Sequence, residues 1–268
     1  MIIWLASYPK SGNTLLRSIL ATYFFSKEGE FKFDYLYKIE QFPSISNFEN
    51  IGVDVLNEKK VFNNFIQAQK FINKEKNKIK FIKTHASLSR INDSNFTDLE
   101  NTLGAIYIVR DPRNVIKSYA HHYDLSLDEA ADAMIDQTRW LVKTDKMFKT
   151  FLSSWSINYN SWKQLGDKVL FVKYEDLINK KKIILIKIFK FIQKLGMQNL
   201  NLNMTKLNKV IKSTEFRVMQ ELEKKQDFKE GVIDSKTKKR KPFFKYGPKN
   251  NWKNGLDPAN QKKNRKKF

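Results

Sequence analysis

The residues best suited to chemistry form a short loop after an apolar run near the start of the sequence. The run IIWLAS leads into YPKSGNT, and a helical pattern begins at Leu15. In such a loop Gly12 lets backbone N–H groups approach an oxyanion, Thr14 adds a hydroxyl, and the following helix contributes the positive end of its dipole. The combination predicts a site for phosphate or a similar anion. The alternative is an ordinary strand-to-helix turn.

The position of the lysine in this loop narrows the choice of anion. Loops that bind nucleoside triphosphates have the form G-x-x-x-x-G-K-[ST], with the lysine directly after the second glycine. When Gly12 is aligned with that glycine, Asn13 occupies the lysine position and Lys10 enters from the other side of the loop. The sequence therefore disfavours binding of Mg-triphosphate, which an ATP-dependent kinase of this kind needs.

A histidine ends the second apolar run, IKFIKTH. If this run is a strand of the same parallel sheet, His85 lies at the edge that carries the anion loop, where an imidazole with a pKa near ~6.5 can act as a general base. The two other histidines, His121 and His122, are adjacent and have no metal-ligand spacing. We interpret them as surface or helix-packing residues.

The third and fourth runs, GAIYIVRD and KVLFVKYED, lead into an arginine and a tyrosine. Arg110 offers a planar fork for a phosphate group, and Ser118, eight residues later, adds a hydroxyl. The alternative for Arg110 is an ion pair with Asp111 or with another neighbour. Tyr174 brings a flat ring to the same edge of the predicted sheet.

The four runs predict buried strands, and helical patterns lie between them. Alternating strands and helices favour an α/β fold with a central parallel sheet flanked by helices, a three-layer P-loop-like fold. Ligands of such sheets bind beyond the carboxyl ends of the strands. The predicted helices are 15–25, 61–74, 115–122, 128–147 and 180–195.

The basic composition indicates an attraction to anions. Fifty Lys and Arg residues against 28 acidic ones give a net charge of +22 in 268 residues, which we expect to form one domain over 1–268. A nucleic-acid-binding protein is one alternative, and solvated surface charge without a partner is another. The absence of cysteine excludes disulfides and thiolate metal sites. No segment approaches the ~20 apolar residues of a membrane span, and the expected location is cytoplasmic.

Two segments have a strongly basic character. The run 180–195 alternates aliphatic residues with lysines, which suits a helix packed on the sheet or, as the alternative, a helix lying on a membrane surface. Residues 236–268 contain 13 Lys or Arg and the single acid Asp257, with clustered Gly, Pro and Asn. We expect this C-terminal segment to be rich in loops and to lack a core of its own.

Taken together and in this order, the motifs resemble the soluble sulfotransferases that use 3'-phosphoadenosine 5'-phosphosulfate (PAPS). The loop SYPKSGNT is similar to the 5'-phosphosulfate loop of that family, and KTH, YIVRDPRNVIKSY and KYGPKNNWKN are similar to its later motifs. The resemblance covers the chain from Tyr8 to about Asn254. It implies PAPS as donor, 3'-phosphoadenosine 5'-phosphate (PAP) as product, and no metal. In that case the basic segment 236–268 would close over the bound nucleotide.

The resemblance also implies roles for individual residues. Lys10 would stabilise the leaving phosphate and His85 would deprotonate the acceptor, with Lys83 beside it in the catalytic group. The nucleotide would be bound by Lys10, Ser11, Gly12, Asn13, Thr14, Arg110, Ser118, Tyr174, Thr214, Phe216, Lys245, Tyr246 and Gly247.

Four positions depart from the family pattern. Leu15 stands where many members have a tryptophan against the adenine, and Asn13 replaces a common threonine but keeps hydrogen-bonding ability. Lys245 and Tyr246 replace an Arg-Lys pair. The acceptor would be a small molecule, lipid or sugar that offers a hydroxyl or amine, bound by loops within 28–57, 88–101 and 124–150. Aromatic residues between Phe31 and Phe42 either line that pocket or belong to the core. Nucleic acid is not an expected partner, and a homodimer is allowed.

Overall fold

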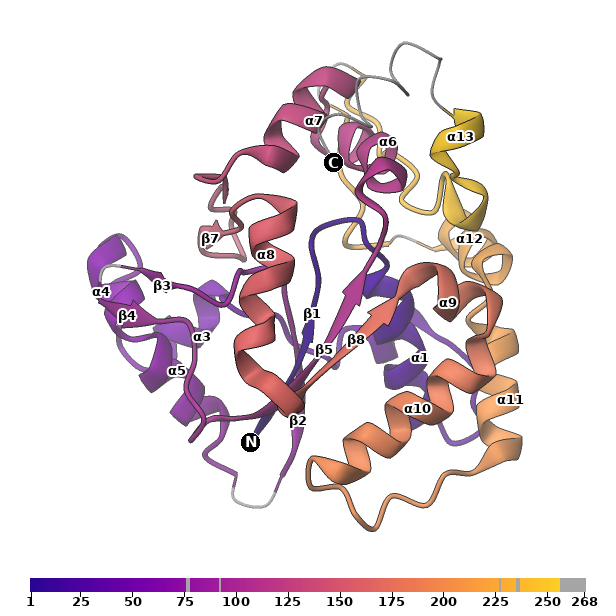
Figure 1. Cartoon of the computed structure of the whole chain (residues 1–268), viewed down its shortest axis with the longest axis horizontal. Coiled ribbons are helices and arrows are strands. Elements are labelled where there is room, and N and C mark those ends of the chain that lie inside the picture. Colours follow the sequence, from indigo (N-terminus) through magenta and orange to yellow (C-terminus); the bar gives the residue numbers. More distant parts are fainter. Residues whose placement is uncertain (76–77, 92, 227, 235–236, 256–268) are drawn as a thin grey trace.

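In a computed structural model of the chain, four parallel strands form a central sheet with helices on both faces (Figure 1). The structure describes residues 1–75, 78–91, 93–226, 228–234 and 237–255. The strand order is β2-β1-β5-β8, so the first strand lies inside the sheet. The α/β fold and all four predicted strands are thereby confirmed: β1 is Ile2–Ala6, β2 Lys80–Thr84, β5 Thr102–Val109 and β8 Val169–Lys173.

Strand β1 shows why the fold has three layers. All five of its residues are buried. Ile3 and Leu5 join the core on one face, while Trp4 joins the core on the other, because successive side chains of a strand point to opposite faces. The first face is covered by α1 (Asn13–Phe25), α10 (Lys181–Lys194) and α11 (Met204–Ser213), and the second by α4 (Glu58–Asn63), α5 (Phe65–Ile72) and the 3-10 helix η1 (Trp162–Lys168).

The remaining elements surround this sheet (Figure 1). The helices are α2 (Phe33–Leu36), α3 (Ile45–Glu49), α6 (Pro112–Tyr123), α7 (Leu127–Ile135), α8 (Trp155–Ser161), α9 (Tyr174–Asn179), α12 (Phe216–Lys225), η2 (Gly247–Lys249) and α13 (Trp252–Gly255). Two short antiparallel pairs join β3 (Arg90–Ile91) to β4 (Ser94–Asn95) and β6 (Trp140–Leu141) to β7 (Thr150–Phe151).

The helix predicted over 128–147 is wrong beyond Ile135. The side chain of Asp136 accepts hydrogen bonds from the backbone N–H and the hydroxyl of Thr138, a local turn that competes with helical bonding. The chain then enters β6. The helix predicted over 61–74 is interrupted at Asn64, whose side-chain amide donates to the carbonyl of Lys60. Helices α11 and α12 were not predicted.

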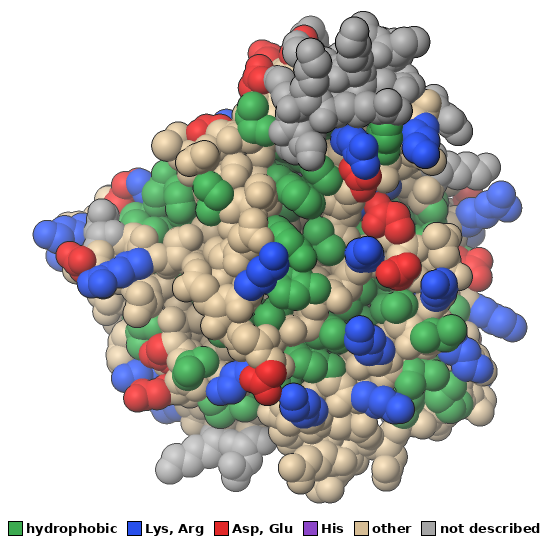
Figure 2. All heavy atoms as spheres, in the orientation of Figure 1, with side chains coloured by type: hydrophobic (Ala, Val, Ile, Leu, Met, Phe, Trp, Pro, Cys, Tyr) green, Lys and Arg blue, Asp and Glu red, His purple; other side chains and the backbone are tan. Residues whose placement is uncertain are grey.

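Helix α10 packs on the sheet, as predicted. Its buried residues are Leu185, Ile188, Phe189 and Ile192, which join the core beneath the first face of the sheet. Of the described residues, no helix is long and apolar enough to span a membrane. Figure 2 shows lysine and arginine side chains spread over one face of the molecule among acidic and hydrophobic ones, without a single continuous basic patch.

The aromatic residues between positions 31 and 42 belong mostly to the core. Phe31 and Phe33 are buried on the side of α1, and Tyr35 and Tyr37 pack against the same cluster. Phe42 alone of this group lines the pocket described below. The single-domain organisation stays a prediction, and residues 236 and 256–268 of the basic segment lie outside the described residues.

Candidate functional site

The carboxyl ends of the four strands open into a pocket of about 1230 Å³. This is the edge where ligands of parallel sheets bind. All but two of the predicted site residues line the pocket: Lys10, Gly12, Asn13, Thr14, Lys83, His85, Arg110, Ser118, Tyr174, Phe216, Lys245, Tyr246 and Gly247. Residues far apart in the sequence therefore meet in one place, as the motif order predicts.

The loop after β1 requires glycine at position 12. Gly12 has a φ of 106°, in the left-handed region, and caps the start of α1. A Cβ added there would lie 2.4 Å from Cδ2 of Tyr174. The ring of Tyr174 is itself covered by Arg110, whose Cζ lies 4.2 Å from the ring centroid. The close approach of loop and ring therefore depends on the missing side chain.

Replacing Gly12 with alanine should destabilise the fold more than the same change at Gly52. Both glycines have positive φ, but a Cβ at Gly52 meets nothing within 4 Å. Backbone strain is thus common to both variants, and only Gly12→Ala forces Tyr174 to move, which we expect to add about 1–3 kcal/mol. Urea denaturation measures the difference. Equal loss of stability in the two variants would show that Tyr174 moves aside without a loss of folding free energy.

Three predicted nucleotide contacts have side chains that are hydrogen-bonded within the protein or buried away from the pocket. The amide of Asn13 donates to the carbonyl of Leu5 at 2.9 Å and to Ser7 Oγ at 3.2 Å, so it fastens the loop to β1. Ser11 is fully buried and does not line the pocket. Thr214 Oγ1 donates to the carbonyl of Val210 at the end of α11 and is likewise absent from the pocket wall.

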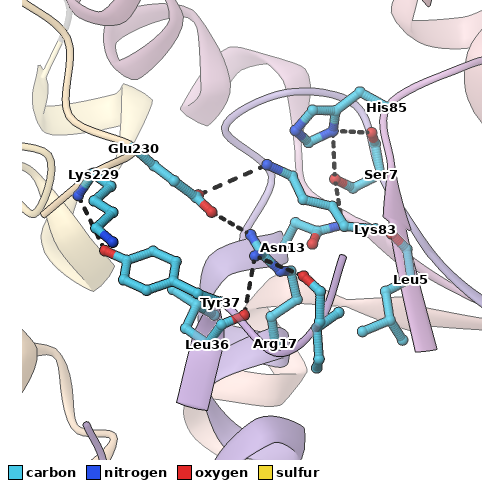
Figure 3. Close-up of polar contacts among 11 residues, drawn as sticks. Leu5, Ser7, Asn13, Arg17, Leu36, Tyr37, Lys83, His85, Lys229 and Glu230 are labelled. Carbon is cyan, nitrogen blue, oxygen red and sulfur yellow. Dashed lines mark hydrogen bonds and ion pairs between the residues drawn. The ribbon is translucent and has the colours of Figure 1, made fainter. Parts of the chain in front are cut away.

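The hydrogen bonding of His85 fixes its tautomer. Its Nδ1 lies 2.7 Å from the backbone carbonyl oxygen of Ser7, and a carbonyl oxygen only accepts (Figure 3). Nδ1 therefore carries the proton and Nε2 keeps a lone pair. Burial, together with the charge of Lys83, lowers the pKa of His85 to about 3, so the ring is neutral at physiological pH.

Beside His85 lies a buried group of charges that the sequence did not predict. Glu230 accepts a hydrogen bond of 2.7 Å from Nη1 of Arg17, and its other oxygen lies 3.7 Å from Nζ of Lys83 (Figure 3). Burial alone would raise the pKa of Glu230, but the charges of Lys83 and Arg17 outweigh it and lower the pKa to about 2. The carboxylate is therefore ionised between two cations.

Lys10 and Lys83 crowd positive charge into the same region. Burial lowers the pKa of Lys83 to about 8, and burial plus the charge of Lys83 lowers the pKa of Lys10 to about 7. Nζ of Lys10 lies 3.7 Å from the centroid of the Phe243 ring. An anion bound here would favour the protonated form of both lysines.

Arg110 is directed to the pocket and not to its neighbour in the sequence. Asp111 binds Arg113 through two hydrogen bonds, of 2.9 and 2.6 Å, so the ion pair considered for Arg110 is wrong. Among the described residues no other carboxylate lies within 4.0 Å of Arg110, and its Nη2 donates instead to the carbonyls of Gly247 and Asn250. Its Nε is buried without a hydrogen-bond partner in the described part of the chain. A buried arginine with spare donors is suited to an anion.

The C-terminal segment touches this site closely. Gly247 has a φ of 56°, and a Cβ there would lie 2.6 Å from the Phe216 ring. Phe216 and Leu15 both line the pocket. They provide apolar surface close to position 15, where the family pattern has a tryptophan. His122, expected on the surface or in helix packing, also lines the pocket, and burial lowers its pKa to about 3.

The chain belongs to the sulfotransferase domain family, whose model matches residues 2–268. Among its relatives, mouse sulfotransferase 1 family member D1 is 26% identical over 271 residues, which cover 97% of this chain and 80% of the mouse protein. The solved structure of mouse SULT7A1 complexed with PAP has 22% identity and a TM-score of 0.62, covering 99% of this chain and 81% of that one. Retinol dehydratase, in a complex with retinol and PAP, has 16% identity, a TM-score of 0.60 and coverages of 99% and 79%.

Proposed function

We propose that the protein transfers a sulfuryl group from PAPS to an acceptor that offers a hydroxyl or amine. One observation carries this proposal: a single pocket contains the loop with Lys10 before Gly12, the spare donors of Arg110, and a neutral His85. The loop suits the 5'-phosphosulfate of PAPS and Arg110 suits the 3'-phosphate, while His85 suits the acceptor. Family membership and the PAP-bound relatives support it.

In this proposal each residue acts on one part of the reaction. Nε2 of His85 takes the proton from the acceptor as the acceptor oxygen or nitrogen bonds to sulfur. The bond between sulfur and the bridging oxygen breaks, and its electron pair leaves on the phosphate of PAP. Lys10 stabilises that developing charge, since fixed cations lower the barrier to in-line group transfer. Lys83 adds a second positive charge close to Lys10.

The 5'-phosphate is assigned to the start of α1. Thr14 supplies a hydroxyl, and residues 12–14 supply backbone N–H groups, because the first N–H groups of a helix lack partners within it. Ser11 and Asn13 contribute through the backbone, since their side chains are engaged or buried. Arg110 and Ser118 take the 3'-phosphate, and Tyr174 and Phe216 the adenine.

The C-terminal segment is assigned the role of a cover over the nucleotide. Lys245, Tyr246 and Gly247 line the pocket, and Arg110 already contacts the carbonyls of this segment. Thr214 supports α11 beneath the adenine site. A small-molecule acceptor is supported by the retinol in one of the related structures.

PAP should bind far more tightly than adenosine 5'-phosphate or ATP. Arg110 gains a charged partner only from a 3'-phosphate, a contact worth about 1.5–3 kcal/mol, or roughly 10- to 100-fold in affinity. Calorimetric titration of the three nucleotides measures this, and Arg110→Gln should bring the affinity for PAP close to that for adenosine 5'-phosphate. The exposed Arg90, which pairs with Asp93, provides the control Arg90→Gln.

Two results would contradict the proposal. Equal affinity for PAP and adenosine 5'-phosphate would show that the pocket has no site for the 3'-phosphate. Preference for ATP in the presence of Mg²⁺ would favour a kinase instead.

A further inference from the structure

One end of the pocket lies on the His85 side and is formed by two segments outside the nucleotide motifs. Gln41 forms an isolated β-bridge with Lys83, and Ser44 forms one with Met147. Residues 41–44 therefore connect the end of β2 to the chain before β7. Asn158 donates one hydrogen bond to the carbonyl of His85 and another to that of Leu152. These contacts place residues 139–152 against the proposed base.

The wall of this end is largely apolar. Trp140 packs against Phe151 with ring centroids 4.9 Å apart, and Val142 is 80% exposed although it lines the pocket. The apolar lining residues here are Phe42, Trp140, Leu141, Val142, Met147 and Phe148. A site of this composition suits the hydrocarbon body of an acceptor.

Arg139 brings a positive charge to the same wall, and the described residues give it no carboxylate partner within 4.0 Å. Its backbone carbonyl accepts from the N–H groups of Leu152 and Ser153 at 2.9 and 3.0 Å, which ties it to the His85 side. Arg139 lines the pocket, and its Nε is buried with no hydrogen-bond partner among the residues that the structure describes. Burial raises the pKa of the neighbouring Tyr119, and the guanidinium opposes this rise.

The acids near Arg139 are engaged elsewhere. Of the described residues, Glu215 and Glu230 are the carboxylates that line the pocket. Glu230 is held by Arg17 and Lys83, and Glu215 directly precedes Phe216 on the nucleotide side. Asp136 accepts hydrogen bonds from Thr138, which lower the pKa of its carboxyl group, and the charge of Arg139 adds to this effect without a salt bridge; Asp136 does not line the pocket. The wall around Arg139 therefore favours a negative group on the ligand.

We infer that the acceptor is an apolar molecule that carries, besides its hydroxyl, an anionic group such as a carboxylate, which Arg139 binds. The inference rests on the proposed sulfotransferase function and narrows its acceptor class. An acceptor with a cationic amine is disfavoured, because bringing a second cation next to a partly buried guanidinium costs electrostatic free energy.

The test uses the full chain, PAPS and two matched sets of acceptors. One set is 4-hydroxyphenylpropionate, 4-propylphenol and tyramine, and the other is 12-hydroxydodecanoate, dodecanol and 12-aminododecanol. In at least one set, kcat/KM for the carboxylate should exceed that for the neutral compound by about 10-fold or more, as expected for a charged hydrogen bond. The amine should be the poorest substrate.

Variants of Arg139 separate this contact from a structural role. Arg139→Gln should lower kcat/KM for the carboxylate alone, Arg139→Lys should restore part of it, and Arg139→Glu should shift preference toward the amine. The matched control is Lys143→Gln, since Lys143 donates to the carbonyl of Val55 and does not line the pocket. Affinity for PAP, measured by calorimetry, should be unchanged in all of them and reports correct folding.

The outcomes distinguish the two proposals. If the unmodified protein does not bind PAP, the sulfotransferase function itself fails. If PAP binds but no carboxylate is preferred in either set, or if Arg139→Gln affects all acceptors equally, the anionic acceptor is overturned and the function stands.

Discussion

His85→Asn is expected to lower kcat by about 100- to 10,000-fold while leaving PAP affinity unchanged. The asparagine amide can still donate to the carbonyl of Ser7, as Nδ1 of His85 does, but it offers no lone pair equivalent to Nε2. The variant thus keeps the local hydrogen bond and removes the base. Turnover of labelled PAPS measures kcat, and calorimetry measures PAP binding.

A comparison with His85→Ala sharpens this result. The alanine variant loses both the base and the hydrogen bond to Ser7. Any loss of kcat beyond that of the asparagine variant therefore measures the contribution of this hydrogen bond. Full activity of the asparagine variant on an acceptor that the unmodified protein sulfates would show that His85 only supports the loop after β1.

Glu230→Gln is expected to destabilise the protein by about 3–5 kcal/mol, the usual effect of breaking a buried ion pair from one side. The side chain of Arg17 is 1% exposed and that of Glu230 is 16% exposed. The amide oxygen can still accept a hydrogen bond from Arg17, but it carries no charge, so the guanidinium stays buried among neutral acceptors that include the carbonyls of Leu36 and Ile39. Urea denaturation measures the change in the free energy of unfolding.

A surface ion pair provides the matched control. Glu28 binds Lys209 with both side chains more than half exposed, so Glu28→Gln should change stability by no more than about 1 kcal/mol. The double variant Arg17→Met with Glu230→Gln should recover much of the loss, because it removes the unpaired buried charge. Equal effects of Glu230→Gln and Glu28→Gln would mean that the buried pair contributes no more than the surface pair.

The sequence allowed the strands and the main polar residues at their ends to be predicted because both are local patterns. Lys10, His85 and Arg110 each follow an apolar run directly, and the parallel sheet brings the ends of those runs together. The strands β6 and β7 have two residues each, too few for a period to be recognised. The wall they form falls within the loop range 124–150 expected to bind the acceptor, but its strands and the part played by Arg139 were not predicted.

The pairing of Arg17 with Glu230 could not be predicted from local sequence patterns. The two residues are 213 positions apart, and Glu230 lies in a segment without periodic pattern. Arg17 did leave a signal, since it interrupts an otherwise apolar run in α1 and is buried. A charge at such a position requires a buried partner, but only the fold identifies which one.

The position of β1 inside the sheet has a consequence for the order in which the molecule forms. Its partners β2 and β5 begin about 80 and 100 residues later in the chain, and β8 joins later still. Loops of this length slow folding, because their closure entropy is lost before the contacts form. During synthesis the anion loop leaves the ribosome long before Glu230 and Gly247, since Glu230 follows Arg17 of helix α1 by 213 positions. Assembly of the pocket is thus a late event relative to synthesis of its first loop.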